Sequence, residues 1–152
     1  MFFHPKSILL RILSVFPVLF ALQSLALAGS VYQLERGDPD RKAVLNALRP
    51  AIEAQMRGPV EFVVSSITVE NDWAFAVVEP QRPGGRRINP ANTAFSNTFE
   101  YMDGFTTFAL LKFQYRRWNL VDHVIGPTDV AWSNWGNHYG SGTAIFSSAV
   151  SR

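Results

Sequence analysis

A change in hydrophobic period at Gly58-Pro59 constrains the fold of this chain more than any other feature. Before this point, apolar side chains recur every four residues, as on one face of an α-helix: Val44, Leu48, Ile52 and Met56. After it, residues 61–70 and 73–78 are rich in β-branched and aromatic side chains and read as β-strands. This order predicts an α+β domain in which the helix packs its apolar stripe on a sheet.

The predicted helix has a clear start, an interruption and an end. Asp38 precedes Pro39, and an Asp cap followed by proline at the first helical position is a frequent helix start. Pro50 lies inside the helix and lacks a backbone N–H, so we expect it to kink the helix or divide it in two. Gly58-Pro59 is expected to end it.

Four strands are predicted, over residues 61–70, 73–78, 105–115 and 118–125. The apolar side chains of the first strand change parity at Ser65-Ser66, so a bulge is expected there. Asn71-Asp72 and Arg116-Arg117 are expected to turn the two hairpins. The expected architecture is one curved, four-stranded antiparallel sheet wrapped on the Pro-kinked helix. It resembles the cystatin-like and NTF2-like folds, which host enzymes, binders and inhibitors alike.

Residues 1–28 resemble a secretory signal peptide. Lys6 and Arg11 give a positive flank, residues 12–22 are almost wholly apolar, and Ala26-Leu27-Ala28 has small residues at the positions that signal peptidase reads. We expect export by the Sec pathway to the periplasm and cleavage after Ala28. The alternative is an uncleaved anchor, but the apolar core is shorter than the ~20 residues of a spanning helix. No membrane contact is expected after cleavage.

The rest of the chain is expected to contain one domain, over residues 38–135. Residues 29–37 form a short polar lead-in that is expected to be flexible. Residues 136–152 are rich in Gly and Ser and are expected to form a flexible tail.

Composition excludes some functions. The chain has no cysteine, so an exported domain of this sequence has no disulfides and depends on its apolar core. Loss of Lys6 and Arg11 with the signal peptide leaves equal numbers of basic and acidic side chains. A nucleic-acid-binding domain usually has a basic balance and a basic face, so nucleic acid is not an expected partner.

Catalytic motifs are scarce. The sequence has no nucleophile elbow, no phosphate loop and no HExxH zinc motif. Asp122, His123 and Asp103 are the weak acid–base candidates, since a His held by a carboxylate can act as a general base. Adjacent strand residues face opposite sides, however, so Asp122 and His123 are not expected to pair. No metal site or cofactor is expected, because a metal needs at least three convergent ligands.

Two regions are candidate binding sites. The long irregular stretch 80–104 carries Arg82, Arg86 and Arg87, of which Arg86 and Arg87 are the candidates for an anionic partner; solvated loop charges are the alternative. Within it, residues 95–102 are expected to form a short helix or a flap.

The second region is a short C-terminal helix that Thr128-Asp129 is expected to cap. It would carry Trp132 and Trp135. These two side chains would either stack on a sugar or peptide or close one end of the core.

The segment Trp118–Trp132 contains Gly-Pro-Thr-Asp-Val-Ala-Trp. With the helix 38–57, it resembles a family of uncharacterised exported proteins of Gram-negative bacteria. The resemblance implies a periplasmic location and no known activity, and such relatives are expected to have Gly at the turn where Arg116-Arg117 stands here.

The sequence therefore favours a non-enzymatic periplasmic module that binds a protein, a peptide or a small envelope ligand. The alternatives are a small NTF2-like enzyme that uses Asp122 and His123 in a pocket at the end of the sheet, and an assembly accessory without a ligand.

Overall fold

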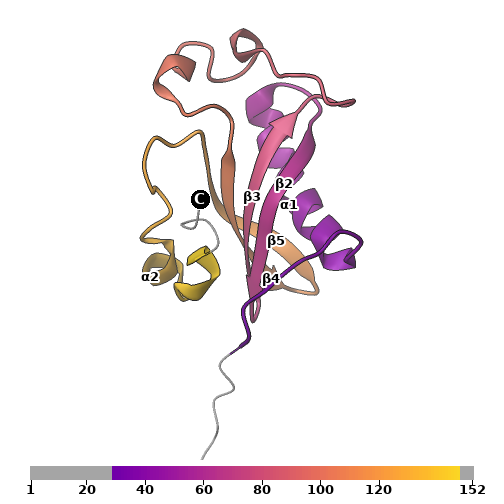
Figure 1. Ribbon diagram of the computed structural model, residues 1–152, viewed down its shortest axis with the longest axis vertical. Helices are drawn as coiled ribbons and strands as arrows, with labels where there is room; N and C mark the ends of the chain where they lie inside the picture. The colour runs from indigo at the N-terminus through magenta and orange to yellow at the C-terminus, as the bar shows by residue number, and fades with distance from the viewer. Residues whose placement is uncertain (1–28, 148–152) are drawn as a thin grey trace, which may run out of the picture.

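The computed structural model describes residues 29–147. They form a five-stranded antiparallel sheet with a long helix on one face and the C-terminal segment, residues 126–147, on the other (Figure 1). The elements are β1 (Tyr32–Gln33), α1 (Pro39–Met56), β2 (Glu61–Glu70), β3 (Trp73–Gln81), η1 (Pro90–Asn92), η2 (Phe99–Tyr101), β4 (Thr107–Gln114), β5 (Arg117–Ile125), α2 (Trp135–Tyr139) and η3 (Ala144–Phe146). The α+β class is confirmed. The predicted signal peptide and residues 148–152 of the predicted tail lie outside the described residues.

The sheet has five strands where four were predicted, because β1 lies in the segment expected to be a flexible lead-in. Tyr32 pairs with Val69 of β2, and Gln33 pairs with Thr68. Leu34 follows with 2% of its surface exposed, and its carbonyl accepts a hydrogen bond from the Arg41 guanidinium at 2.7 Å. A strand of two residues is too short to produce a hydrophobic period, which explains why the sequence pattern missed it.

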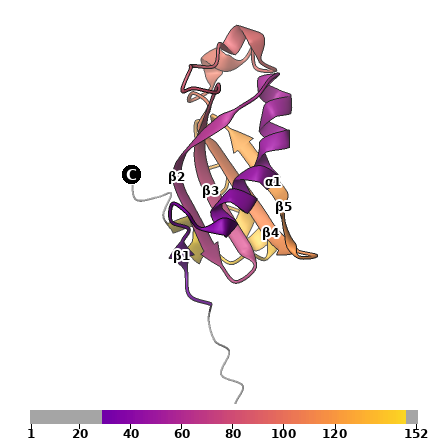
Figure 2. The same ribbon diagram turned by 90° about the vertical axis from the view of Figure 1, so that its right-hand side faces the viewer.

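Helix α1 begins as predicted. The Asp38 carboxylate accepts a hydrogen bond from the Asp40 backbone N–H at 2.8 Å, and Pro39 is the first helical residue. Pro50 lies inside one continuous helix, so the predicted division does not occur, and Figure 2 shows the helix axis changing direction along its length. Arg57 ends the helix in the left-handed conformation, with its N–H donating to the Glu53 carbonyl.

The strand register contains the predicted bulge in β2 and moves one of the predicted turns by a residue. Val64 pairs with Val78 and Ser66 with Val77, so Ser65 is the extra residue of a bulge. This bulge returns the apolar side chains of β2 to one face. The β4–β5 turn is formed by Tyr115 and Arg116, both with positive φ. It therefore lies one residue earlier than the predicted Arg116-Arg117 turn.

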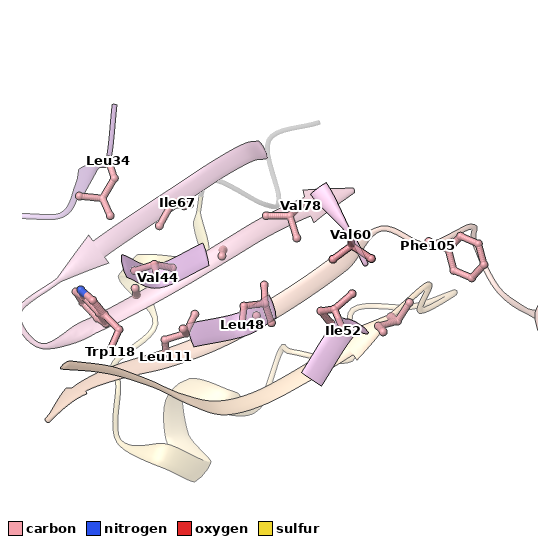
Figure 3. Close-up of a cluster of buried hydrophobic side chains, with 14 of the residues drawn as sticks. Leu34, Val44, Leu48, Ile52, Val60, Ile67, Val78, Phe105, Leu111 and Trp118 are labelled. Atoms are coloured by element: carbon pink, nitrogen blue, oxygen red, sulfur yellow. The ribbon is translucent and has the colours of Figure 1, made fainter. Parts of the chain in front are cut away.

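The first core lies between α1 and the sheet. The buried stripe of α1 packs on side chains from the strands, as Figure 3 shows for Val44, Leu48 and Ile52. Beneath the helix, β3 contributes the small side chains Ala74 and Ala76, both fully buried, which let the helix approach the sheet closely. Apolar burial on this scale is the main stabilising term for a domain without disulfides.

A second core covers the opposite face of the sheet. Its buried members come from the strands and from the C-terminal segment: Trp73, Phe75, Val77, Leu110, Trp132, Trp135, Ile145 and Phe146. The ring centroids of Phe75 and Phe146 are 4.7 Å apart, with an edge-on geometry favourable for aromatic pairs. The prediction of a flexible tail is therefore wrong for residues 136–147, which fold back on the sheet (Figure 1).

Candidate functional site

The long connection from β3 to β4 lies at one end of the sheet, away from β1 (Figure 1). Strand β3 continues through Pro80 to Gln81, so the connection starts later than predicted. Past Val78, β3 pairs with β2 but no longer with β4, and a proline is tolerated where a strand lacks a partner on one side. The absence of β4 here leaves space that the connection partly fills.

A cleft of about 570 Å3 opens in this space, and we call it the loop cleft. Its lining comes from the end of β3, the connection and the start of β4: Glu79, Pro80, Gln81, Gly85, Arg87, Ile88, Pro90, Phe99, Gly104 and Phe105. The volume lies within the ~300–1,000 Å3 that is usual for ligand sites.

The apolar wall of the loop cleft is part of the first core. Ile88 and Phe105 are 7% and 6% exposed, and the Phe99 and Phe105 ring centroids are 4.7 Å apart. The predicted short helix or flap at 95–102 is present as the 3₁₀ helix η2. Phe95 and Phe99 are partly buried and pack against the first core, so this part of the connection is attached to it.

Two opposite charges line the loop cleft, Glu79 and Arg87. Glu79 Oε2 accepts a hydrogen bond from the Thr106 hydroxyl at 2.9 Å. Arg87 is exposed, and no hydrogen bond or ion pair joins its guanidinium to any other residue in the range 29–147. The two charges share one cleft without neutralising each other.

The environment of Glu79 opposes ionisation. Burial raises the pKa of Glu79 above its ordinary value, and the hydrogen bond from Thr106 partly offsets this effect. A half-buried carboxylate of this kind gains from a cation placed beside it, because the cation replaces some of the lost hydration.

The other two loop arginines have different surroundings. Arg82 donates to the carbonyl groups of Met56 at 2.7 Å and Pro59 at 3.1 Å, so it satisfies the C-terminal end of α1. Arg86 donates from Nε to the Pro83 carbonyl at 3.3 Å and does not line the loop cleft. Of the two predicted binding residues here, the structure places only Arg87 in a cleft.

A second cleft of about 430 Å3 lies on the face of the sheet that the C-terminal segment covers. Asp103 lines it, together with Asp129, Thr106 and Trp132. The Thr106 hydroxyl donates to Glu79, so this hydrogen bond joins a lining residue of each cleft. Asp103 donates its backbone N–H to the Gly126 carbonyl at 2.9 Å, which ties the two loops together.

Asp122 and His123 point away from each other, as strand alternation predicts. Asp122 accepts a hydrogen bond from the Tyr139 hydroxyl at 2.7 Å, whereas the His123 ring meets Gln55 of α1, with 2.6 Å between the two Nε2 atoms. The Gln55 Nε2 atom can only donate, so this contact needs the tautomer in which His123 Nε2 accepts. Neither side chain lines a cleft described above.

The titration of these groups follows from their contacts. Burial lowers the pKa of His123 below its ordinary value of 6.5, against the opposing charge of Asp122. The hydrogen bond to Asp122 raises the pKa of Tyr139 above its ordinary value. Both side chains link elements of the fold, since His123 joins β5 to α1 and Tyr139 joins α2 to β5.

Trp132 and Trp135 are buried, at 7% and 8% exposure. The Trp132 ring stacks on Phe108 at 3.7 Å between centroids. The prediction that they form a stacking platform is therefore not supported, and they serve the second core. The short helix begins at Trp135, after Asn134, so Asp129 does not cap it as predicted.

Sequence reasoning overlooked Glu79, Phe99 and Phe105 as cleft residues. One signal was available for Glu79, since it is the first charged residue of β3 and follows six apolar residues, 73–78. Such a carboxylate at the end of a buried strand is either solvated or placed for a partner.

In the part of the chain that the structure describes, no three His, Asp or Glu side chains converge so as to hold a metal ion. No helix within residues 29–147 is long and apolar enough to cross a membrane. We found no protein-family model, no curated protein and no solved structure that matches the chain. The functional argument therefore rests on the geometry of the loop cleft.

Proposed function

We propose that this chain is an exported, periplasmic binding protein without enzymatic activity, and that the loop cleft is its binding site. The observation that carries the proposal is the two opposite charges, Glu79 and Arg87, on the lining of an otherwise largely apolar cleft; neither forms an ion pair within residues 29–147. A buried apolar wall with a few convergent polar groups is the usual composition of a ligand site.

Export is supported by the charge and apolar pattern of residues 1–28. The resemblance of residues 118–132 to exported Gram-negative proteins also supports export. A helix that lies on one face of an antiparallel sheet supports a cystatin-like or NTF2-like architecture, in which binding modules are common.

The enzymatic alternative has less support. An NTF2-like enzyme would need Asp122 and His123 in a common pocket, whereas they contact different elements on opposite faces of β5. A general base must reach the proton that it removes, and each of these side chains already has a partner within the fold.

The test begins with the full chain expressed in a bacterium with a periplasm. We expect mass spectrometry of the periplasmic product to show cleavage after Ala28. The purified product is then titrated with anilinonaphthalene sulfonate, an aromatic anion that suits Arg87 and the apolar wall, and amide NMR shifts locate the bound probe. Shifts confined to the residues of the loop cleft are expected.

Two matched variants sharpen this test. Arg87→Gln should weaken the binding of the probe, whereas Arg86→Gln, on the adjacent exposed arginine outside the cleft, should not. Equal binding by both variants, or shifts elsewhere in the molecule, would show that the loop cleft is not the site.

A further inference from the structure

The charges of the loop cleft define the ligand more closely than its volume does. Arg87 offers a cation with several donors and no partner among residues 29–147. One carboxylate oxygen of Glu79 accepts a hydrogen bond from Thr106. The other oxygen forms no hydrogen bond within the described residues, and it is not buried. Each charge is thus available to a bound molecule.

The two charges also have complementary requirements. An anionic group of a ligand would pair with the planar Arg87 guanidinium, which matches a carboxylate bidentately. A cationic group would pair with Glu79, whose partial burial makes a compensating positive charge favourable. A ligand with only one charge would leave the other side chain of the cleft uncompensated and would partly desolvate it.

The remaining lining is mainly apolar. Ile88, Phe99 and Phe105 form one wall, and two prolines add to it. These surfaces favour an apolar group between the two charged ends, and they offer little to a sugar or another strongly hydrated molecule.

We infer that the loop cleft binds a small apolar zwitterion, a short peptide or amino acid with a free amine held by Glu79 and a free carboxylate held by Arg87. This inference rests on the proposed function of the cleft. The two possible sources share the same charged ends and differ only in length, which the experiment distinguishes.

The test uses the exported chain purified from periplasm and three forms of the dipeptide leucyl-phenylalanine. The unmodified peptide has both charges, the N-acetyl form keeps only the carboxylate, and the C-terminal amide keeps only the amine. We expect either modification to weaken binding to the wild-type protein about tenfold, the usual scale for loss of a charge-assisted hydrogen bond. Free phenylalanine serves as the amino-acid arm: tighter binding of the dipeptide indicates a peptide site, and equal or tighter binding of phenylalanine indicates an amino-acid site.

Variants of the protein assign each end of the ligand. Glu79→Gln keeps an acceptor for Thr106 but should lose the distinction between the free and acetylated peptides. Arg87→Gln should lose the distinction between the free and amidated peptides. Arg86→Gln and Glu100→Gln, exposed neighbours that do not line the cleft, should behave as the wild type.

Different experimental results would contradict this inference and the proposed function. If the aromatic sulfonate maps to the loop cleft but all three peptide forms bind equally well or not at all, the cleft is a binding site and the zwitterion assignment is wrong. If neither the sulfonate nor the peptides shift the resonances of the cleft residues, both proposals fail.

Discussion

Replacement of Ile145 by alanine tests whether the C-terminal segment is an integral part of the fold. The Ile145 side chain is fully buried in the second core, against rings that include Phe75 and Trp135. No strand of the sheet pairs with this segment, so side-chain burial is its main attachment. A loss of methyl groups here therefore acts directly on the docking of the segment.

The magnitude follows from burial and from the surroundings. An Ile→Ala change in a filled core costs ~2–5 kcal/mol, of which one part is lost transfer free energy and the other is the cavity. Ile145 is fully buried in a cluster that contains several large aromatic rings, so we expect a loss of about 3 kcal/mol, near the middle of this range. If docking of the segment is worth less than this, the segment opens locally and the loss equals the docking free energy.

Urea unfolding followed by tryptophan fluorescence measures the effect. With a denaturant slope of about 2 kcal/mol per molar urea, the midpoint should fall by about 1.5 M. Val130→Ala is the control, since Val130 is 51% exposed in the same segment, and surface changes usually stay within ~0.5 kcal/mol. Equal midpoints for the two variants, together with unprotected amides at residues 135–147 in hydrogen exchange, would refute the packing of this segment.

Three further perturbations test other parts of the structure. Leu48→Ala removes a fully buried side chain from the centre of α1 and should cost ~2–5 kcal/mol in free energy of unfolding; a loss below ~0.5 kcal/mol, the surface scale, would place this helix face outside the core. Gly126→Ala should cost at least about 2 kcal/mol, because Gly126 has a φ of +58° and an added Cβ would lie 2.3 Å from the Gly104 carbonyl oxygen; an unchanged melting temperature would contradict the close approach of these loops. The folded-state pKa of His123 lies below 6.5, so its contribution to stability is complete above pH 6.5 and is lost as the pH falls through the folded pKa. His123→Gln should therefore show a smaller loss of stability between pH 7 and 5 than the wild type, and an NMR titration midpoint above 6.5 for His123 would reverse this expectation.

The parts of the fold that the sequence predicted are those with a local physical cause. The stripe of α1 recurs every four residues from Val44 to Met56, and the Asp38 cap satisfies a backbone donor that any helix leaves free. The bulge at Ser65 was predictable because a parity change within an apolar strand must be absorbed somewhere. Each of these signals is contained in a few neighbouring residues.

The features that were missed depend on contacts distant in sequence. β1 is fixed by its pairing with β2 rather than by its own pattern. Ile145 and Phe146 are the main apolar residues of a Gly- and Ser-rich stretch, and they pack on the face of the sheet opposite α1, a surface that is distant in sequence. The β4–β5 turn uses Tyr115 and Arg116 at positive φ, a conformation that residue preferences assign to Gly, Asn or Asp.

For the candidate site, the sequence located the connection between β3 and β4 but not its chemistry. Arg86 and Arg87 are neighbours with identical side chains, and only the path of the chain decides that Arg87 faces the cleft. Glu79 becomes relevant because β4 stops opposite Val78 and leaves the carboxylate beside an opening. The sequence marks Glu79 as the first charge after an apolar run, but it signals neither which arginine faces the cleft nor where β4 begins.

The covering of the sheet on both sides determines where a ligand can bind. Residues 73–78 of β3 are buried on both faces, by α1 on one and by the C-terminal segment on the other. A concave sheet face is therefore not open to a ligand in the described part of the chain. The space that remains lies at the end of the sheet, where Glu79 and its neighbours extend past β4 and the connection only partly closes over them. Glu79 lies on β3, and Arg87 directly precedes Ile88, which is buried in the first core. Both charged groups are therefore next to packed residues, and binding need not order a free loop.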